Sequence, residues 1–285
     1  MQRERVSENV YWFQSELYAQ VTAGVVAGPN WAVLIDTLAI PEETLGISSF
    51  IEEDLNIPVR YIINTHHHAD HTWGNCCFPG ATIIASETCR QLLIEKGIPA
   101  LENAKKQNPA FKQTKIVPPQ ITINHGQLSL RVGKKNLLLF PTPGNSPDAI
   151  SVLVEEDRVL FAGDAYMSLP YIVDGDIDEL TTTIKHIGKM GLENIIQGHG
   201  DIILRGEIEE NVKENLNYLS CLRKGVRNAL KRKNPEEALV TIDIESCGKN
   251  RVFLGGLALE LHRRNVLYLF KKLKSEEMQQ IDLPL

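Results

Sequence analysis

The chain has 285 residues, 43% of them hydrophobic, which is enough to bury the core of one large domain or of one domain with an appendage. The net charge of −6 argues against general nucleic-acid binding, and no apolar run approaches the length of a membrane span, so we expect neither nucleic-acid nor membrane partners. The first residues lack the apolar core of a secretory signal, and five cysteines, an odd number, give no disulfide framework, so we expect a cytoplasmic protein.

The first quarter of the sequence alternates strands and helices. A turn signal, Gly28-Pro29-Asn30, separates two predicted strands, and the segment after them is typical of a helix. In chain order we predict strands at residues 18–27 and 31–38, a helix at 41–55, and a short buried strand at 59–64. Residues that directly follow a buried strand are held by a rigid scaffold and have open space beyond them.

Four histidines and an aspartate follow this strand, in the run His66-His67-His68-Ala69-Asp70-His71. Imidazole and carboxylate both bind zinc, iron and manganese. His66 and His68, two residues apart on extended chain, can point the same way, whereas His67 should face outward or support them from behind. Asp70 and His71 follow on the turn, where they can reach a second metal. A tag would be terminal and uninterrupted, so we interpret this run as a metal site rather than as a tag or a histidine-rich loop.

Strands and helices continue to alternate beyond the metal run. We predict a strand at 82–85, a helix at 87–96, strands at 127–132, 136–140, 149–154 and 158–162, a helix at 178–190 and a strand-like run at 194–197. Residues 97–120 are polar and contain several prolines, so we predict a long surface loop there, a candidate wall of the substrate site. Elements in this order fit two mixed sheets covered by helices.

The last part of the chain is dominated by long helices. Apolar residues from Ile208 to Leu230 recur at spacings of three and four, and residues 257–273 contain a second apolar helix. We therefore predict a catalytic core at 1–203 and a helical extension at 204–285 that packs on the core and could also form a homodimer face. Basic residues along these helices are interpreted as a solvated face rather than a site for anions. They are Arg223, Lys224, Arg227, Lys231, Arg232 and Lys233.

The order His66-x-His68-x-Asp70-His71 after an apolar strand resembles the signature of the metallo-β-lactamase fold superfamily. Residues 140–148 resemble the family's Pro-Gly-His-Thr/Ser segment, residues 160–164 its Gly-Asp segment, and residues 198–200 its final Gly-His segment. All four occur in the family's order, across about residues 17–201. The resemblance implies the α/β (α+β) class and an αβ/βα four-layer sandwich, here with a C-terminal helical extension.

The resemblance also implies a set of metal ligands. They are His66 and His68 for a first site, Asp70, His71 and His199 for a second, and Asp164 between the two sites. A carboxylate has two oxygens and can bridge ions about 3.5–4 Å apart. The alternatives are that Asp164 caps a helix or turn, and that His199 is an ordinary loop histidine. We interpret the remaining histidines, His125, His186 and His262, as structural.

One position departs from the family's pattern. The family usually has a histidine after Pro143-Gly144 that completes the first site, and this chain has Asn145. An amide oxygen is a harder and weaker donor than imidazole. Three outcomes stay open: Asn145 ligates directly or through water, one ion dominates because the first site is weak, or the preferred metal shifts toward iron or manganese. Ser146 and Asp148 nearby could compensate.

These features predict a metal-dependent hydrolase that holds one or two Zn²⁺ ions, with Fe or Mn as alternatives, and acts on a small-molecule substrate. A metal-bound hydroxide of lowered pKa would attack the carbonyl carbon of a thioester, lactone, ester or β-lactam. Asp70 would be both a ligand and the catalytic residue that orients the hydroxide. The alternatives are a mononuclear iron oxygenase resembling persulfide dioxygenases, and a degenerate, non-catalytic binding protein. The intact ligand set argues against the latter.

Overall fold

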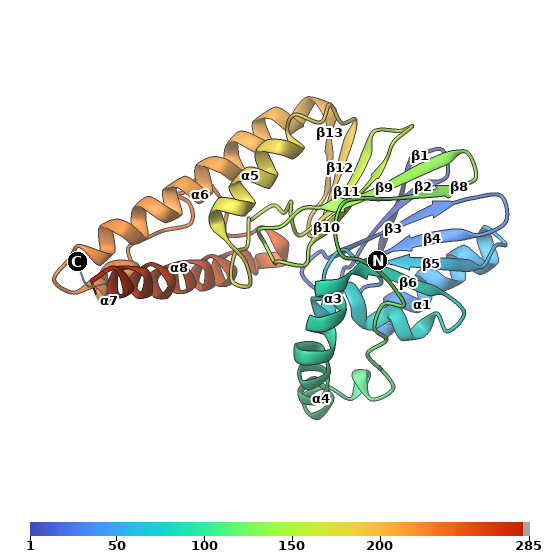
Figure 1. Cartoon of the computed structure of the whole chain (residues 1–285), viewed down its shortest axis with the longest axis horizontal. Helices are drawn as coiled ribbons and strands as arrows, with labels where there is room; N and C mark the ends of the chain where they lie inside the picture. The colour runs from blue at the N-terminus through green and yellow to red at the C-terminus, as the bar shows by residue number, and fades with distance from the viewer. Residues whose placement is uncertain (282–285) are drawn as a thin grey trace.

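Two β-sheets packed face to face form the centre of the chain, and helices cover the outer face of each (Figure 1). The computed structural model describes residues 1–281. In spatial order, the first sheet consists of β1 (Gln2–Ser7), β2 (Val10–Gln14), β3 (Thr22–Ala27), β4 (Ala32–Ile35), β5 (Val59–Ile63), β6 (Thr82–Ser86) and β7 (Ile121–Ile123). The second consists of β13 (Ile202–Leu204), β12 (Asn194–Gln197), β11 (Val159–Gly163), β10 (Ile150–Val154), β9 (Lys135–Pro141) and β8 (Leu128–Val132).

Parallel strands bring several strand ends to the same edge of the sandwich. In the first sheet β4 to β7 run parallel, and in the second sheet β11 and β12 do. Parallel neighbours need a crossover connection. The crossover from β4 to β5 contains α1 (Pro41–Ser49) and the π-helical turn η1 (Phe50–Asp54), and the crossover from β11 to β12 contains α5 (Ile177–Ile187). The carboxyl ends of these four strands carry the residues of the candidate site.

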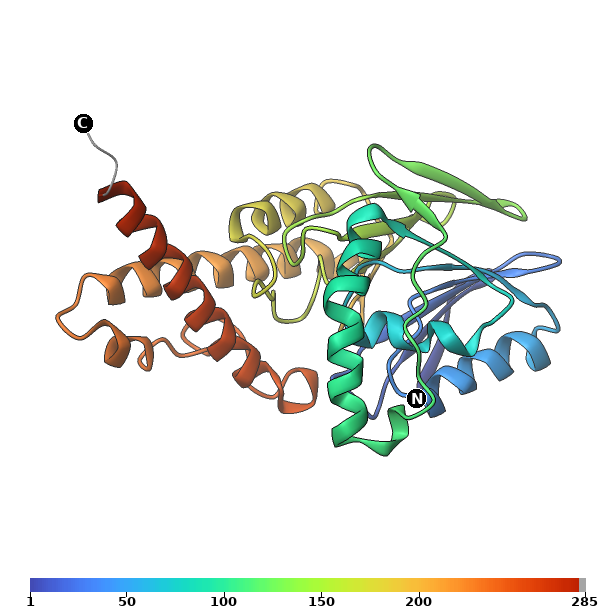
Figure 2. The ribbon, with the colours of Figure 1, turned by 60° about the horizontal axis from the view of Figure 1, so that its bottom comes forward.

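The remaining helices flank the sandwich and extend it. Between β5 and β7 lie α2 (Ala69–Thr72), η2 (Trp73–Cys77), α3 (Glu87–Leu92), η3 (Leu93–Gly97), α4 (Ile98–Gln107) and η4 (Pro109–Phe111). After β13 follow η5 (Arg205–Glu207), α6 (Ile208–Leu230), α7 (Pro235–Leu239), η6 (Leu254–Gly256) and α8 (Ala258–Ile281). Figure 2 shows α3, η3 and α4 as one helical column, and α8 crossing α6 at the C-terminal end of the molecule.

Three buried hydrophobic clusters define the layers. One lies between the sheets and includes Val33 and Val152. Another lies between the first sheet and α1 and includes Ile47. The third joins the second sheet to α5, α6 and α8, and includes Leu160 and Leu222. Apolar burial on both faces of each sheet stabilises this order of layers. The predicted α/β four-layer sandwich with a C-terminal helical extension is therefore confirmed.

The surface loop predicted at residues 97–120 is wrong over its first half, which is helical. Pro99 lies in the first turn of α4, which directly continues the π-helical turn η3. Leu101 and Phe111 pack in one small cluster with Trp73, close in sequence to the metal run. Because the members of this cluster lie on separate segments, the mostly polar composition of residues 97–120 does not indicate a helix there. The strand β1 is mostly exposed, so no apolar pattern marks it in the sequence.

The prediction that the cysteines form no disulfide is also wrong. Cys221 of α6 is bonded to Cys247, and their Cα atoms lie 5.4 Å apart, within the normal range for a disulfide. The two residues lie on separate elements, so their spacing in the sequence gives no sign of the pair. Cys76, Cys77 and Cys89 are free.

Within residues 1–281, no helix combines the length and the apolar character needed to cross a lipid bilayer. The division of the chain at residues 203 and 204, the homodimer through the C-terminal helices, the absence of nucleic-acid partners and the cytoplasmic location stay predictions. The third hydrophobic cluster runs without a break from β11 to α8, so the C-terminal helices share the core of the second sheet.

Candidate metal centre

The candidate site lies at the carboxyl ends of four strands, three of which are followed by predicted ligands. Asp36 follows β4, the metal run follows β5, Asp164 follows β11, and His199 lies two residues after β12. Parallel neighbours end at the same edge of a sheet, where ligands of α/β proteins commonly bind. The fold therefore gathers side chains that lie far apart in the sequence.

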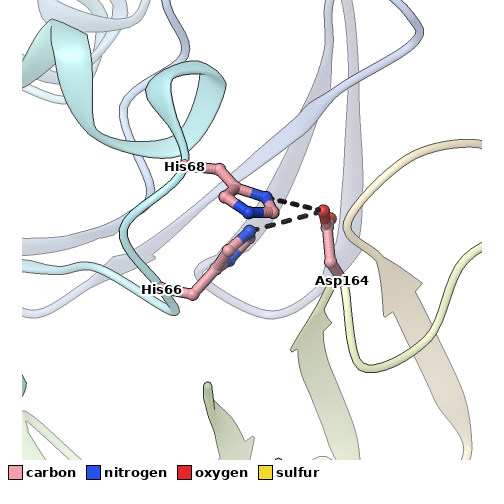
Figure 3. A group of neighbouring side chains, drawn as sticks. All are labelled: His66, His68 and Asp164. Carbon is pink, nitrogen blue, oxygen red and sulfur yellow. Dashed lines mark ion pairs between the residues drawn. The ribbon is translucent and has the colours of Figure 1, made fainter. Parts of the chain in front are cut away.

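Figure 3 shows the first group, in which His66 and His68 point toward Asp164. Nε2 of His66 lies 3.3 Å, and Nδ1 of His68 lies 3.7 Å, from Oδ2 of Asp164. The potential ligand atoms of the three side chains all lie within 4.8 Å of one another. One divalent ion could therefore contact all three.

The second group consists of Asp70, His71 and His199, whose ligand atoms also lie within 4.8 Å of one another. Nε2 of His199 lies 3.3 Å from Oδ2 of Asp70. Oδ1 of Asp164 lies 3.2 Å from Nε2 of His71 and 3.5 Å from Nε2 of His199. Asp164 thus turns one oxygen toward each group, as a bridging carboxylate must. The structure brings six of the seven predicted ligands together, and their binding of metal stays a prediction.

Each of these four histidines also contacts a polar atom on its far side. The pairs are His66 Nδ1 with Thr65 Oγ1 (3.0 Å), His68 Nε2 with Asp174 Oδ2 (3.2 Å), His71 Nδ1 with Asp36 Oδ2 (2.8 Å) and His199 Nδ1 with the carbonyl oxygen of Ala19 (2.9 Å). Carbonyl and carboxylate oxygens can only accept, so the ring nitrogens of His68, His71 and His199 that face them carry the proton. The Thr65 hydroxyl donates to Oδ2 of Asp36 and therefore accepts from Nδ1 of His66. The other ring nitrogen of each histidine is then free to donate its electron pair toward the centre.

Buried charges at the centre favour a cation. Burial alone would raise the pKa of Asp164, but the imidazoles of His199 and His71 hold that pKa well below its usual range. Burial opposes protonation of His71, yet the carboxylates of Asp164 and Asp36 hold its pKa well above the ordinary value. Ionised carboxylates among imidazoles attract either protons or a metal ion, so binding of a divalent cation should release protons.

Three buried polar atoms of the two groups have no hydrogen-bond partner within the described part of the chain. They are Nε2 of His66, Nε2 of His71 and Oδ1 of Asp164. A buried polar atom without a partner costs free energy, and such atoms are rare in native proteins. Imidazole nitrogen and carboxylate oxygen are donors that zinc accepts. The residues present therefore fit bound divalent ions.

Asn145 is fully buried in the connection between β9 and β10. Neither oxygen nor nitrogen of its side-chain amide has a hydrogen-bond partner among residues 1–281. A buried amide in this condition fits a side chain that obtains its partner from a bound ion or its water. Direct ligation by Asn145 stays a prediction.

Replacing Asn145 with histidine tests this position. Because imidazole is a stronger zinc donor than an amide oxygen, we expect Asn145→His to tighten zinc binding by about tenfold or more. Competition with a chromophoric chelator measures the affinity, and Asn145→Ala, which offers no donor, is the matched control. Equal zinc affinity in the histidine and alanine variants would show that residue 145 does not reach the metal.

His67 does not join the metal groups, and the alternative that it faces outward is wrong. It is buried, its backbone N–H donates to Oδ2 of Asp148 at 2.7 Å, and its Nδ1 lies 3.0 Å from Oδ1 of the same carboxylate. Burial alone would raise the pKa of Asp148, but these bonds from His67 hold the pKa below its usual range. Asp148 thereby fixes the backbone between the predicted ligands His66 and His68.

Removal of this carboxylate should destabilise the fold. Asp148→Ala leaves two buried donors of His67 unpaired, and we expect the free energy of unfolding at pH 7 to fall by about 1–3 kcal/mol. The folded-state pKa of Asp148 is depressed, so its contribution is present above the unfolded pKa of about 3.9 and is lost as pH falls below it. Urea unfolding of wild type and variant should therefore differ at pH 7 and converge in acid. Equal stabilities at pH 7 would refute this role.

Sequence reasoning missed three polar partners of the histidines: Asp36, Thr65 and Asp174. Asp36 is buried and accepts from the backbone N–H of Thr65 at 2.8 Å and from its hydroxyl at 2.7 Å. An aspartate directly after the buried strand β4 was the available signal, because β4 is the parallel neighbour of β5. Asp174 lies in a loop with no pattern of its own, and no comparable signal marks it.

Comparison with known proteins agrees with this geometry. The family model described as the metallo-β-lactamase superfamily matches residues 18–209. A β-lactamase-like protein 2 homologue from Caenorhabditis elegans is 25% identical over 214 residues, covering 74% of this chain and 65% of that protein. A thioesterase from Emericella nidulans is 27% identical over 173 residues, covering 60% of this chain and 43% of that protein. The chain thus spans less than two thirds of the length of these relatives.

Solved structures share the fold. A metallo-β-lactamase family protein from Thermus thermophilus has a TM-score of 0.70 at 17% identity, covering 96% of this chain and 95% of that one. A stereoselective inverting sec-alkylsulfatase from Pseudomonas has a TM-score of 0.70 at 13% identity, covering 95% of this chain and 50% of that one. With a family model that matches well over half of its length, this chain belongs to the metallo-β-lactamase superfamily.

Proposed function

We propose that this chain is a metal-dependent hydrolase that cleaves a carbonyl compound, with a thioester, lactone, ester or β-lactam as the candidate bond. The observation that carries the proposal is the pair of His/Asp groups joined by the two oxygens of Asp164. His66, His68 and Asp164 would hold one ion, and Asp70, His71 and His199 a second, with zinc as the expected metal and iron or manganese as alternatives. Divalent metal bound there would lower the pKa of water and polarise a carbonyl oxygen.

Asp70 differs from Asp164 in its exposure. The side chain of Asp70 is 16% exposed, whereas that of Asp164 is 3% exposed, so of these two carboxylates Asp70 is the one that solvent or substrate can reach. Burial opposes ionisation of Asp70, but its contact with His199 holds its pKa below the usual range. Asp70 therefore stays ionised at neutral pH and can accept a hydrogen bond from an attacking water, which orients it for reaction.

Tyr18 directly precedes Ala19, which accepts from His199, and lies within electrostatic reach of Asp70. The negative charge of Asp70, followed by burial, raises the pKa of the Tyr18 hydroxyl, which therefore stays protonated. The residue is 47% exposed. A protonated hydroxyl at such a place can donate a hydrogen bond to a substrate oxygen.

The choice of substrate is the finer part of the proposal. Among the relatives described above, one is named a thioesterase and one a β-lactamase-like protein, so thioesters and β-lactams come first in a substrate panel. Fold alone does not select between them, because unrelated chemistries recur on one fold.

A hydrolysis panel tests the proposal. Purified protein is stripped with a chelator, reloaded with zinc, iron or manganese, and assayed on thioesters, lactones, esters and a chromogenic β-lactam. We expect activity that is lost on stripping and regained on reloading. Metal-independent hydrolysis, or none with any metal, would contradict the proposal. Because Asn145 replaces an imidazole with a harder oxygen donor, a mononuclear iron oxygenase is the second candidate, and oxygen uptake with a persulfide would support it.

A further inference from the structure

The polar partner of His68 differs in origin from those of the other three histidines. Thr65, Asp36 and Ala19 belong to the sandwich or to loops next to its strands. Asp174, in contrast, lies in the segment between β11 and α5. Its Oδ2 is 3.2 Å from Nε2 of His68, on the opposite side of the ring from Asp164. A carboxylate cannot donate, so Nε2 of His68 donates and Nδ1 is left to face the first group.

The C-terminal helix α8 holds the segment that carries Asp174. Asn265 of α8 is fully buried, and its amide nitrogen donates to the carbonyl oxygen of Pro170 at 2.8 Å. Its amide oxygen accepts from the backbone N–H of Ile172 at 3.0 Å. Tyr268, one turn further along α8, donates its hydroxyl to the carbonyl oxygen of Gly175 at 2.8 Å. Two side chains of the extension therefore fix the backbone on both sides of Asp174.

The same segment is held from the side of the sandwich. A Cβ atom added to Gly175 would lie 2.1 Å from the carbonyl oxygen of Gly144 and 2.5 Å from that of Asn145, so the two backbones are in direct contact. The backbone N–H of Asp176 donates to the carbonyl oxygen of Gly144 at 2.9 Å. Lys96 of η3 also lies 3.6 Å from Oδ1 of Asp174. The carboxylate is thus placed from three directions.

We propose that Asp174 is a positioning residue for His68, and that α8, through Asn265 and Tyr268, sets its position and thereby tunes metal binding by the first group. The proposal rests on the proposed function as far as metal binding is concerned. Carboxylates that hydrogen-bond a ligating histidine fix its tautomer and ring orientation and raise its basicity. The polar partners of His71 and His199 lie outside the segment between β11 and α5. The influence of α8 on metal binding is therefore confined to the group of His66, His68 and Asp164. The C-terminal extension is then a functional part of the metal centre.

Metal affinity of the full chain tests the first half of the proposal. Metal-free protein is titrated with Zn²⁺ or Co²⁺ in competition with a chromophoric chelator, and the visible absorption of the Co²⁺ form is recorded. Asp174→Ala should weaken one of the two bound ions by about 10- to 100-fold and change its Co²⁺ spectrum. Asp174→Asn keeps an oxygen that accepts from Nε2 of His68, so it should recover part of the loss. Asp178→Ala, an exposed carboxylate paired with Arg223, is the matched control and should bind like wild type.

Variants of α8 test the second half. Tyr268→Phe removes a single hydroxyl and keeps the ring, so it should fold and weaken the same ion by a few-fold, as Asn265→Ala should more strongly if it folds. Both substitutions act through the contact between Asp174 and His68. The double variant Asp174→Ala with Tyr268→Phe should therefore lose less metal affinity than the product of the two single losses. Fully independent effects, or wild-type affinity in Tyr268→Phe, would overturn the role of α8.

The outcomes separate this proposal from the proposed function. If the wild-type chain binds neither Zn²⁺ nor Co²⁺, the metal-dependent function fails, and this proposal fails with it. If wild type binds metal and Asp174→Ala binds it with unchanged affinity and an unchanged Co²⁺ spectrum, the positioning role fails alone, and the proposed function stands.

Discussion

Replacement of Asp164 with alanine is expected to remove metal from both groups and to lower turnover by more than about 100-fold, beyond the loss typical of an outer hydrogen-bond partner. Oδ2 of Asp164 lies closest to the first group and Oδ1 to the second, so one substitution takes a ligand from each. The loss of bound metal should exceed that of any single histidine variant, because each histidine belongs to only one of the two metal groups. Metal content per chain and steady-state hydrolysis are the two measurements.

The control for this experiment is a second buried carboxylate. Glu43 is also buried, but it accepts hydrogen bonds from the hydroxyl of Ser15 and the backbone N–H of Glu16 and belongs to neither metal group, so Glu43→Ala should lose stability while retaining metal. Circular dichroism shows whether each variant is folded. Wild-type metal content in folded Asp164→Ala would rule out the bridging role.

The second large effect is expected at Asp70. Because this carboxylate is the more accessible of the two and would orient the attacking water, Asp70→Ala should lower turnover by about 10²- to 10⁴-fold, the range typical of acid–base groups. The first group contains no atom of Asp70, so its ion should stay bound. Turnover and metal content measured on the same preparation separate loss of chemistry from loss of metal.

Asp201 offers a matched control, since it lies two residues after His199, bonds Gln14 and belongs to neither metal group. Asp201→Ala should therefore keep turnover within a few-fold of wild type, as is usual for a surface position outside the site. Full activity in Asp70→Ala would contradict the proposed mechanism.

The ligand set could be predicted because its signals are local. His66 to His71 form one run after a strand, and Asp164 and His199 each follow a strand-like stretch beside a glycine, so the chemistry is visible within a few residues. The outer partners could not be predicted in the same way. The contact of Asp174 with His68 depends on where α8 places Pro170 and Ile172, and that placement exists only in the folded chain.

The fold shows the same difference between local signals, which could be predicted, and contacts between distant segments, which could not. Strands such as β4 and β11 are continuous apolar runs that any sheet must bury, so the sequence marks them. In the helix at 98–107 only Leu101 is buried, and its partner Trp73 comes from the segment after the metal run. The Cys221–Cys247 disulfide likewise depends on how α6 packs against a later segment.

Elemental analysis of protein purified without added metal tests the central claim most directly. We expect two transition-metal ions per chain, predominantly zinc, and their loss in Asp164→Ala. A single iron per chain would favour the oxygenase and show that Asn145 changes the site. A chain that carries no metal and takes up none on reconstitution would contradict the metal centre, and with it the proposed hydrolase.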